Sequence, residues 1–148
     1  MKVAVLMGSP SDAAKMAPAV ETLERFGVIV DERVMSAHRN PDDVAQFSRR
    51  ARDEGYAAII CGAGMAAALP GVVAAHTTLP VVGVPLSGSA LAGVDALYST
   101  VQMPPGIPVA CVAIDGAKNA AILVVEMLSI TDKELADRLA EFRAGGAR

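Results

Sequence analysis

The chain of 148 residues has no tryptophan, three phenylalanines and two tyrosines, yet hydrophobic residues make up 53% of it. Its apolar character therefore comes from Ala, Val, Leu, Ile and Met, which suit buried parallel strands and closely packed helices. We expect part of this apolar surface to be buried between subunits. The length predicts one domain over residues 1–148, because a second domain would have no room for its own core.

Positive charge is scarce as well. There are 13 Lys and Arg against 16 Asp and Glu, the net charge is -3, and no block of basic residues stands out. Such a chain lacks the electrostatic footprint of a nucleic-acid-binding protein. Gly and Pro interrupt each apolar run before it could span a membrane, and the first residues lack the layout of a signal peptide. We therefore expect neither a nucleic-acid partner nor a membrane.

Cysteine is limited to Cys61 and Cys111, which both lie in apolar runs. No CxxC motif and no Cys/His spacing typical of a metal site is present. The two residues are interpreted as reduced, buried thiols of a cytoplasmic protein rather than as a disulfide. The sequence thus predicts no bound metal.

The remaining pattern alternates short apolar runs with helical stretches. We expect strands near residues 3–7, 28–34, 57–61, 81–84 and 109–114. Between and after them we expect helices ending near Phe26, then over residues 41–54, 65–76, 90–97, 117–128 and 131–143. Thr131 and Glu134 have the spacing of a capping box that would open the last helix. Regular alternation of this kind implies βαβ units and an α/β fold, with a parallel five-stranded sheet and helices on both faces.

Ligands of such sheets bind beyond the carboxyl ends of the strands, which selects the loops at residues 8–12, 36–41, 62–71 and 85–89. The first carries Ser9, Ser11 and Asp12 directly before a helix. Its hydroxyl and backbone N–H groups could hold phosphate oxygens, and Asp12 could accept hydrogen bonds from a ribose. Alternatively, Ser11 or Asp12 simply caps the helix. The loop is neither a Walker motif nor a dinucleotide-binding GxGxxG.

The second loop contains His38 beside Arg39, directly after a predicted strand. Histidine can both donate and accept a proton near neutral pH, and arginine offers a rigid charged fork for phosphate or carboxylate. The alternative is a solvated loop histidine without a chemical role. His76, the second histidine, lies at the far end of a predicted helix and is interpreted as a structural or surface residue.

The third loop, residues 62–71, has small residues and little polar chemistry in its side chains. Small residues let a ligand approach the main chain closely, although close helix packing would explain them equally well.

Together these loops resemble the N5-carboxyaminoimidazole ribonucleotide mutase family, class I of the PurE proteins. The similarity runs from about residue 2 to residue 143, and several motifs keep their order and spacing. The matching stretches are residues 7–12, 36–41, 69–71, 79–85, 93–104, 106–109 and 119–121.

The resemblance implies a flavodoxin-like three-layer sandwich and a homo-octamer whose active sites lie between subunits. It implies an isomerase of de novo purine (IMP) biosynthesis that needs no cofactor and has a nucleotide substrate with transient CO2. His38 would transfer the proton. The implied substrate-binding residues are Ser9, Ser11, Asp12, Ser36, Arg39, Gly64, Ala68 and Leu69.

One position departs from the family, because many members have histidine where this chain has Ala68. We therefore do not expect the side chain at that position to make a polar contact to the substrate. The following Leu-Pro-Gly favours the mutase branch over relatives that carboxylate aminoimidazole ribonucleotide directly with CO2, which remain the alternative.

A non-enzymatic flavodoxin-like nucleotide-binding module is a further alternative. It is disfavoured because the aromatic residues needed to sandwich a flavin are absent from these loops. A receiver domain would need an acceptor Asp after the third strand, where Cys61 and Gly62 stand.

The hypothetical mechanism uses one imidazole twice. His38 would protonate the substrate nitrogen, which releases CO2, and would then take the proton from the ring carbon that attacks the CO2. A small apolar wall over residues 65–69 would exclude water and retain the CO2.

Overall fold

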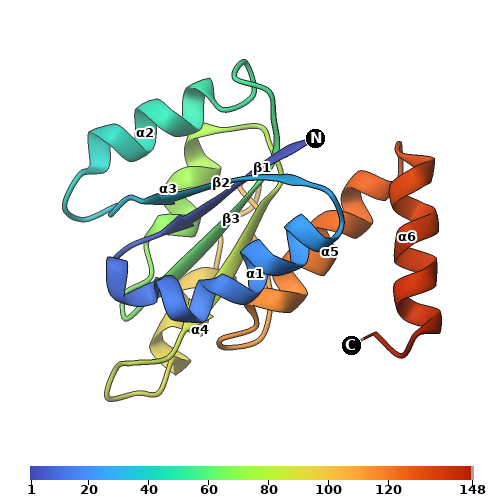
Figure 1. Ribbon diagram of the computed structural model, residues 1–148. Helices are drawn as coiled ribbons and strands as arrows, with labels where there is room; N and C mark the ends of the chain where they lie inside the picture. Colours follow the sequence, from blue (N-terminus) through green and yellow to red (C-terminus); the bar gives the residue numbers. More distant parts are fainter. Residues whose placement is uncertain (148) are drawn as a thin grey trace.

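The computed structural model describes residues 1–147 and has twelve helices and strands. Figure 1 shows how they are arranged in space. The strands are β1 (Lys2–Met7), β2 (Ile29–Val34), β3 (Tyr56–Gly64), β4 (Val81–Leu86) and β5 (Ala110–Cys111). The helices are the 3-10 turn η1 (Pro10–Asp12), α1 (Ala13–Arg25), α2 (Pro41–Arg50), α3 (Leu69–His76), α4 (Val94–Val101), α5 (Ala117–Ser129) and α6 (Lys133–Ala144).

The strands form one sheet in the order β2-β1-β3-β4-β5, and every neighbouring pair is parallel. The predicted α/β fold with a parallel five-stranded sheet is therefore confirmed, and the strand order is that of flavodoxin-like sheets. Because β1, β3 and β4 are covered on both faces, their residues are almost all buried, as expected for internal parallel strands.

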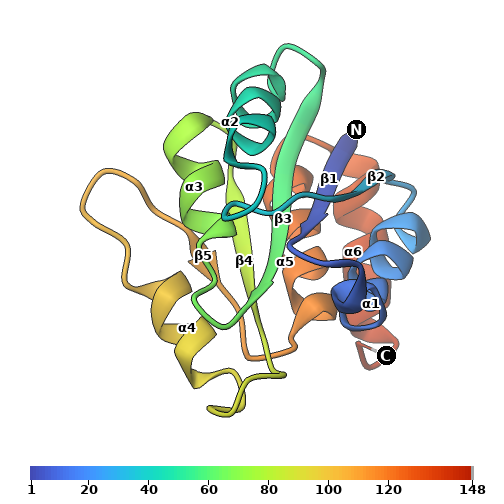
Figure 2. The same cartoon turned by 90° about the vertical axis from the view of Figure 1, so that its left-hand side faces the viewer.

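Two apolar cores lie on opposite faces of the sheet. One packs side chains of α1, α5 and α6 against the sheet, and includes Met16, Leu23, Val124 and Phe142. The other packs α2, α3 and α4 against the opposite face, and includes Val44, Phe47, Val73 and Ala96. Figures 1 and 2 show the resulting three layers, with α6 outermost beside α5.

Several predicted boundaries were wrong, for reasons that lie in the backbone. β3 continues to Gly64, and α3 begins at Leu69 instead of residue 65. Between them Met65 and Ala67 have positive φ angles of 54° and 36°, which no helix tolerates. In the same way, α4 begins at Val94 rather than residue 90, because the residue before it, Gly93, has a φ of 89°.

Other ends also differ. β5 has only two residues, Ala110–Cys111, where six were expected, because only Val82 and Gly83 of β4 pair with it. The predicted capping box is wrong as well. α6 is capped by Asp132, whose carboxylate accepts a hydrogen bond from the Leu135 amide at 3.0 Å, so Thr131 lies outside the cap.

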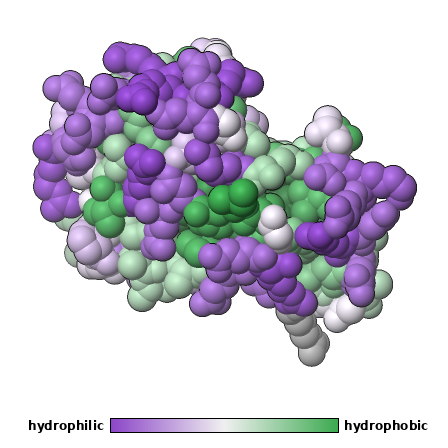
Figure 3. Space-filling model, turned by 45° about the horizontal axis from the view of Figure 1, so that its top comes forward, coloured by the Kyte–Doolittle hydropathy of each residue, from purple (hydrophilic) through white to green (hydrophobic). Residues whose placement is uncertain are grey.

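Apolar side chains remain on the surface. Figure 3 shows one face on which apolar surface lies between largely hydrophilic areas. The large hydrophobic residues that are at least 43% exposed are Met1, Ile29, Val34, Met65, Leu91, Val94, Tyr98, Val101 and Ile130. Within residues 1–147, no helix combines the length and apolar character needed to cross a membrane.

Close packing at Gly83 gives a prediction for stability. A Cβ atom at Gly83 would lie 2.3 Å from Cγ2 of Thr100 and 3.1 Å from Cγ1 of Val109. Thr100 is fully buried, and its hydroxyl donates to the Ala96 carbonyl at 2.8 Å, so its side chain cannot simply turn away. We expect Gly83→Ala to lower the free energy of unfolding by about 1–3 kcal/mol through overpacking.

The measurement is urea unfolding at fixed protein concentration. Gly145→Ala is the matched control, because a Cβ there meets nothing closer than 3.5 Å and the backbone φ is -75°. Equal unfolding midpoints for Gly83→Ala and the wild-type protein would show that the sheet adjusts freely to the added methyl group.

Candidate active site

The carboxyl ends of the central strands meet at one edge of the sheet. Met7 of β1 is in register with Val34 of β2 and with Gly62 of β3, and Gly64 is in register with Leu86 of β4. The four loops selected from the sequence therefore leave the sheet side by side. In Figure 2 this edge is the lower one, where the dark-blue turn into α1 and the yellow connection from β4 to α4 lie.

The first loop turns directly into α1. The Gly8 amide donates to the Gly62 carbonyl at 3.3 Å, which joins the loop to β3. The hydroxyls of Ser9 and Ser11 are 2.9 Å apart, and the Ser11 amide donates to the Ser9 hydroxyl at 3.4 Å. Asp12 occupies the N-cap position of α1, but its side chain makes no capping bond. Asp12 therefore does not cap α1 with its side chain, and the Ser9 hydroxyl caps the preceding turn η1 instead. The hydroxyls of Ser9 and Ser11 thus lie together at a helix start, where a phosphate could replace their mutual hydrogen bond.

The second loop is fixed by Asn40. The Ser36 amide donates to Oδ1 of Asn40 at 2.7 Å, and Nδ2 of Asn40 donates to Asp43 at 3.1 Å. Asn40 precedes α2 but makes no capping bond with it, because its side chain bridges the loop instead. The Arg39 amide donates to the Ser36 hydroxyl at 3.2 Å. The loop is thus a tight, internally bonded turn.

This turn presents His38 and Arg39 to solvent. Nη2 of Arg39 donates to the carbonyl oxygen of Gly8 at 2.7 Å, so the guanidinium joins the first two loops. Within the part of the chain that the structure describes, no hydrogen bond or ion pair engages the ring of His38. The imidazole is therefore free to meet a ligand.

Two cations, Lys15 and Arg39, act electrostatically on Asp12. Partial burial raises the pKa of Asp12, while the backbone of Ser9 and the charges of Lys15 and Arg39 act in the opposite direction. The carboxylate is thus a hydrogen-bond acceptor whose ionised form depends on its cationic neighbours.

The third loop differs from its expected role as a uniform wall. Ala67 and Leu69 are buried in the core, whereas 67% of Met65 is exposed and Ala66 is also exposed. The Ala67 amide donates to the Gly64 carbonyl at 3.0 Å and closes a turn with positive φ at Met65. Backbone conformations of this kind cost free energy and often accompany ligand sites. Ala68 precedes α3 and is partly exposed, so it contributes only a methyl group to this edge.

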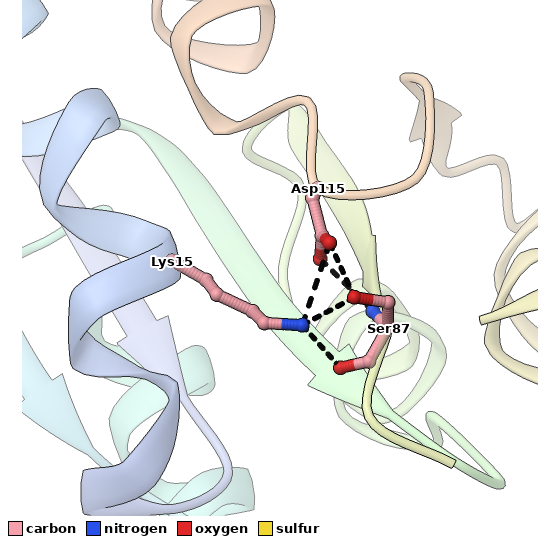
Figure 4. A network of polar contacts seen from close by, with 3 residues as sticks. All are labelled: Lys15, Ser87 and Asp115. Carbon is pink, nitrogen blue, oxygen red and sulfur yellow. Dashed lines mark hydrogen bonds and ion pairs between the residues drawn. The ribbon is translucent and has the colours of Figure 1, made fainter. Parts of the chain in front are cut away.

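The fourth loop carries a polar network that the sequence did not predict. Lys15 of α1 donates to the carbonyl and the hydroxyl of Ser87, and its Nζ lies 3.4 Å from Oδ2 of Asp115 (Figure 4). The Ser87 amide donates to Oδ1 of Asp115 at 2.9 Å, and the Ser87 hydroxyl donates to the same carboxylate. Lys15 and Asp115 are 100 residues apart, and no motif connects them.

Other features lie away from these loops. His76 ends α3, and its Nδ1 is 3.5 Å from Nη2 of Arg49 on α2, which agrees with a structural or surface role.

Three hollows in the surface are lined by other residues: one at β2 and α2, one near Pro80 and Ile107, and one between Phe26 and α6. None of these three includes His38, Arg39 or Ser9. Within residues 1–147, no three His, Cys, Asp or Glu side chains gather as a metal site.

Comparison with known sequences gives consistent matches over nearly the whole chain. The family model described as AIR carboxylase matches residues 2–148. An N5-carboxyaminoimidazole ribonucleotide mutase of Saccharolobus solfataricus is 53% identical over 141 residues, which are 95% of this chain and 89% of the relative. The enzyme of the same name from Escherichia coli strain K12 is 51% identical over 144 residues, with coverage of 96% and 85%.

Comparison with solved structures gives the same result for the fold. The crystal structure of Treponema denticola PurE matches with a TM-score of 0.89 at 31% sequence identity, and the match covers 99% of this chain and 91% of that one.

Proposed function

Because the chain belongs to the AIR carboxylase family, we propose that it is an isomerase of purine biosynthesis that converts N5-carboxyaminoimidazole ribonucleotide to 4-carboxy-5-aminoimidazole ribonucleotide. The observation that carries this proposal is the contact between the Arg39 guanidinium and the Gly8 carbonyl. It brings a free histidine, an arginine and a serine-rich helix start to one place, which is what a proton transfer on a phosphorylated nucleotide requires.

The anionic end of the substrate would bind at the first two loops. Ser9 and Ser11 offer hydroxyls and backbone amides, and Arg39 offers the remaining N–H groups of its fork. Asp12, in its ionised form, would accept hydrogen bonds from the ribose. Ser36 would complete this side from the second loop.

The imidazole of the nucleotide would extend toward His38 and the third loop. Gly64 and Ala68, which are partly exposed, would line that side with small groups. The Leu69 side chain is buried beneath them, so it would act from behind this surface, and the reacting part of the substrate would meet little water. Only Met65 and Ala66 of the expected wall project outward. None of the three hollows described above lies at these residues, so a single chain would offer the substrate an open surface here.

His38 would carry the proton in both half-reactions. Its imidazolium gives a proton to the substrate nitrogen as the N–C bond breaks and CO2 leaves. The ring carbon C4 then forms a bond to the same CO2, and the neutral imidazole takes the C4 proton. The enzyme ends in its starting protonation state, and no atom or electron is gained or lost overall.

A homo-octamer would close the open site, and the family resemblance supplies the number of subunits. Support comes from an apolar stripe formed by Leu91, Val94, Tyr98 and Val101, which are 43–62% exposed. Their spacing of three or four residues places the last three on one face of α4. A second copy of the chain is the occupant that would cover this stripe.

The proposed location of the protein is the cytoplasm. Both cysteines are free thiols, which fits that reducing compartment.

The decisive assay compares two synthetic substrates. We expect purified protein to convert N5-carboxyaminoimidazole ribonucleotide without ATP or added metal, and to use aminoimidazole ribonucleotide with bicarbonate far less efficiently. The product can be followed by its ultraviolet absorbance. Efficient turnover of the second mixture alone would assign the chain to direct carboxylation, the activity named in the family description.

His38→Asn should abolish turnover and leave nucleotide binding nearly intact, because the amide keeps polar contacts but cannot shuttle a proton. We expect kcat to fall by about 100-fold or more, the usual contribution of general acid–base catalysis. Dissociation constants from calorimetry would be compared with kcat from the mutase assay.

Arg39→Ala is the matched contrast, since it removes the neighbouring cation but not the imidazole. Its main effect should be weaker binding, through the loss of charge-assisted hydrogen bonds. If His38→Asn kept the wild-type kcat, His38 would have no role in the chemistry, whatever effect Arg39→Ala has on binding.

Charge on the apolar stripe should weaken assembly. We expect Tyr98→Glu to lower the mass measured by light scattering, because a buried, unpaired carboxylate is costly in an interface. Ser99→Glu is the control, since Ser99 is exposed on the same helix but faces about 100° away. Equal masses for wild-type protein and Tyr98→Glu would exclude this face from the subunit contact.

A further inference from the structure

The network around Lys15 joins three elements at the edge of the sheet where the site lies. Lys15 belongs to the first turn of α1, three residues after Asp12. Its ammonium reaches Ser87 after β4 and Asp115 before α5 (Figure 4). Only about a third of the Lys15 side chain is exposed, 35%, so the contact is partly shielded from solvent.

The geometry points to Lys15 as a positioning residue of the nucleotide site. Anchored on Ser87 and Asp115, it holds the first turn of α1, and with it the Ser9–Asp12 loop, against the ends of β4 and β5. This inference rests on the proposed function, because it concerns the loop that would bind the phosphorylated ribose.

The first loop needs such an anchor because few other bonds connect it to the sheet. The Gly8 amide bonds to β3, and the Gly8 carbonyl accepts from Arg39. Both contacts are at Gly8, the start of the loop. Lys15 supplies the third contact at the other end, so the loop is held on both sides of Ser9 and Ser11.

Asp115 is itself held in an unusual conformation. Its φ is 56°, a region that non-glycine residues rarely adopt, and its amide donates to the Pro85 carbonyl at 2.8 Å. Partial burial acts to raise the pKa of Asp115, but hydrogen bonds from Ser87 and Lys15 outweigh it and lower the pKa. The carboxylate is therefore ionised at neutral pH, and the network is lost only in acid, as pH falls through the lowered pKa.

Lys15 also acts on the neighbouring carboxylate. The charged groups that face Asp12 are Lys15 from α1 and Arg39 from the second loop, and both favour its ionised form. Burial already raises the pKa of Asp12, and removing the ammonium would raise it further, because burial would then be opposed only by the Ser9 backbone hydrogen bond and by Arg39. As pH falls, the carboxylate would then be protonated at a higher pH, and ribose binding that needs the ionised form would be lost there.

The test compares Lys15→Met, Lys15→Arg and Asp115→Asn with the wild-type enzyme. Methionine keeps an unbranched apolar stem and removes the charge, whereas arginine keeps the charge. Asparagine tolerates the positive φ and keeps an acceptor for the Ser87 amide. Lys133→Met is the matched control, because Lys133 is 87% exposed and, among residues 1–147, pairs only with Asp137 on α6, at 3.0 Å.

We expect Lys15→Met to raise KM for N5-carboxyaminoimidazole ribonucleotide about tenfold. Its kcat should stay within about twofold, because His38 is untouched. In the pH profile of kcat/KM, the fall in acid should move to higher pH in Lys15→Met. In Lys15→Arg this acid limb should return toward the wild-type position. Asp115→Asn should raise KM with the acid limb nearly unmoved, since the ammonium remains near Asp12. Lys133→Met should match the wild-type enzyme in both measurements.

Hydrogen exchange separates failure of this inference from failure of the proposed function. If Lys15→Met keeps the wild-type KM and acid limb while the wild-type enzyme turns over, Lys15 has no positioning role and the mutase proposal stands. If the wild-type protein shows no turnover, the mutase proposal fails, and amide exchange over residues 8–15 decides. Faster exchange there in Lys15→Met, at an unchanged unfolding midpoint, supports the anchor, and unchanged exchange overturns it.

Discussion

Parallel pairing of β1 with both β2 and β3 is the constraint on which the candidate site depends. Because all three strands run in one direction, their carboxyl ends lie at the same edge, and the register brings Met7 beside Val34 and Gly62. The loops that follow are therefore neighbours although they are about 30 and 55 residues apart in the sequence. The Arg39–Gly8 hydrogen bond is possible only because this pairing exists.

The sequence predicts the parts of the structure that repeat a pattern. Buried strands such as Val3–Met7 are continuous apolar runs, and their alternation with helices suffices to predict a parallel sheet. The position of His38 and Arg39 at a strand end, and of Ser9, Ser11 and Asp12 before a helix, could be predicted for the same reason. The fold and the grouping of these loops therefore followed from local signals together with the topological rule for parallel sheets.

The sequence does not predict features that depend on contacts between distant residues. The start of α3 at Leu69 is set by the positive φ of Met65 and Ala67, and neither residue type signals such a turn. Asn40 looks like a helix cap, but in the folded chain its amide oxygen bonds to Ser36 instead. The Lys15–Asp115 pair has no sequence signal, because a Lys in an amphipathic helix is ordinarily a solvated surface residue.

Charge placement explains how an acidic chain can hold an anionic ligand. The net charge of -3 gives no general attraction for phosphate, so binding must come from groups fixed at short range. Asp12 adds a negative charge at the very place where phosphate would bind, and Lys15 and Arg39 compensate for it. Arg39 also donates to Gly8, and Lys15 is held by Ser87 and Asp115, so both cations are already held near the loop in the empty site. Preorganised cations avoid the entropy loss of ordering long side chains on binding. This smaller entropy cost compensates for the lack of long-range attraction between the acidic chain and an anionic ligand.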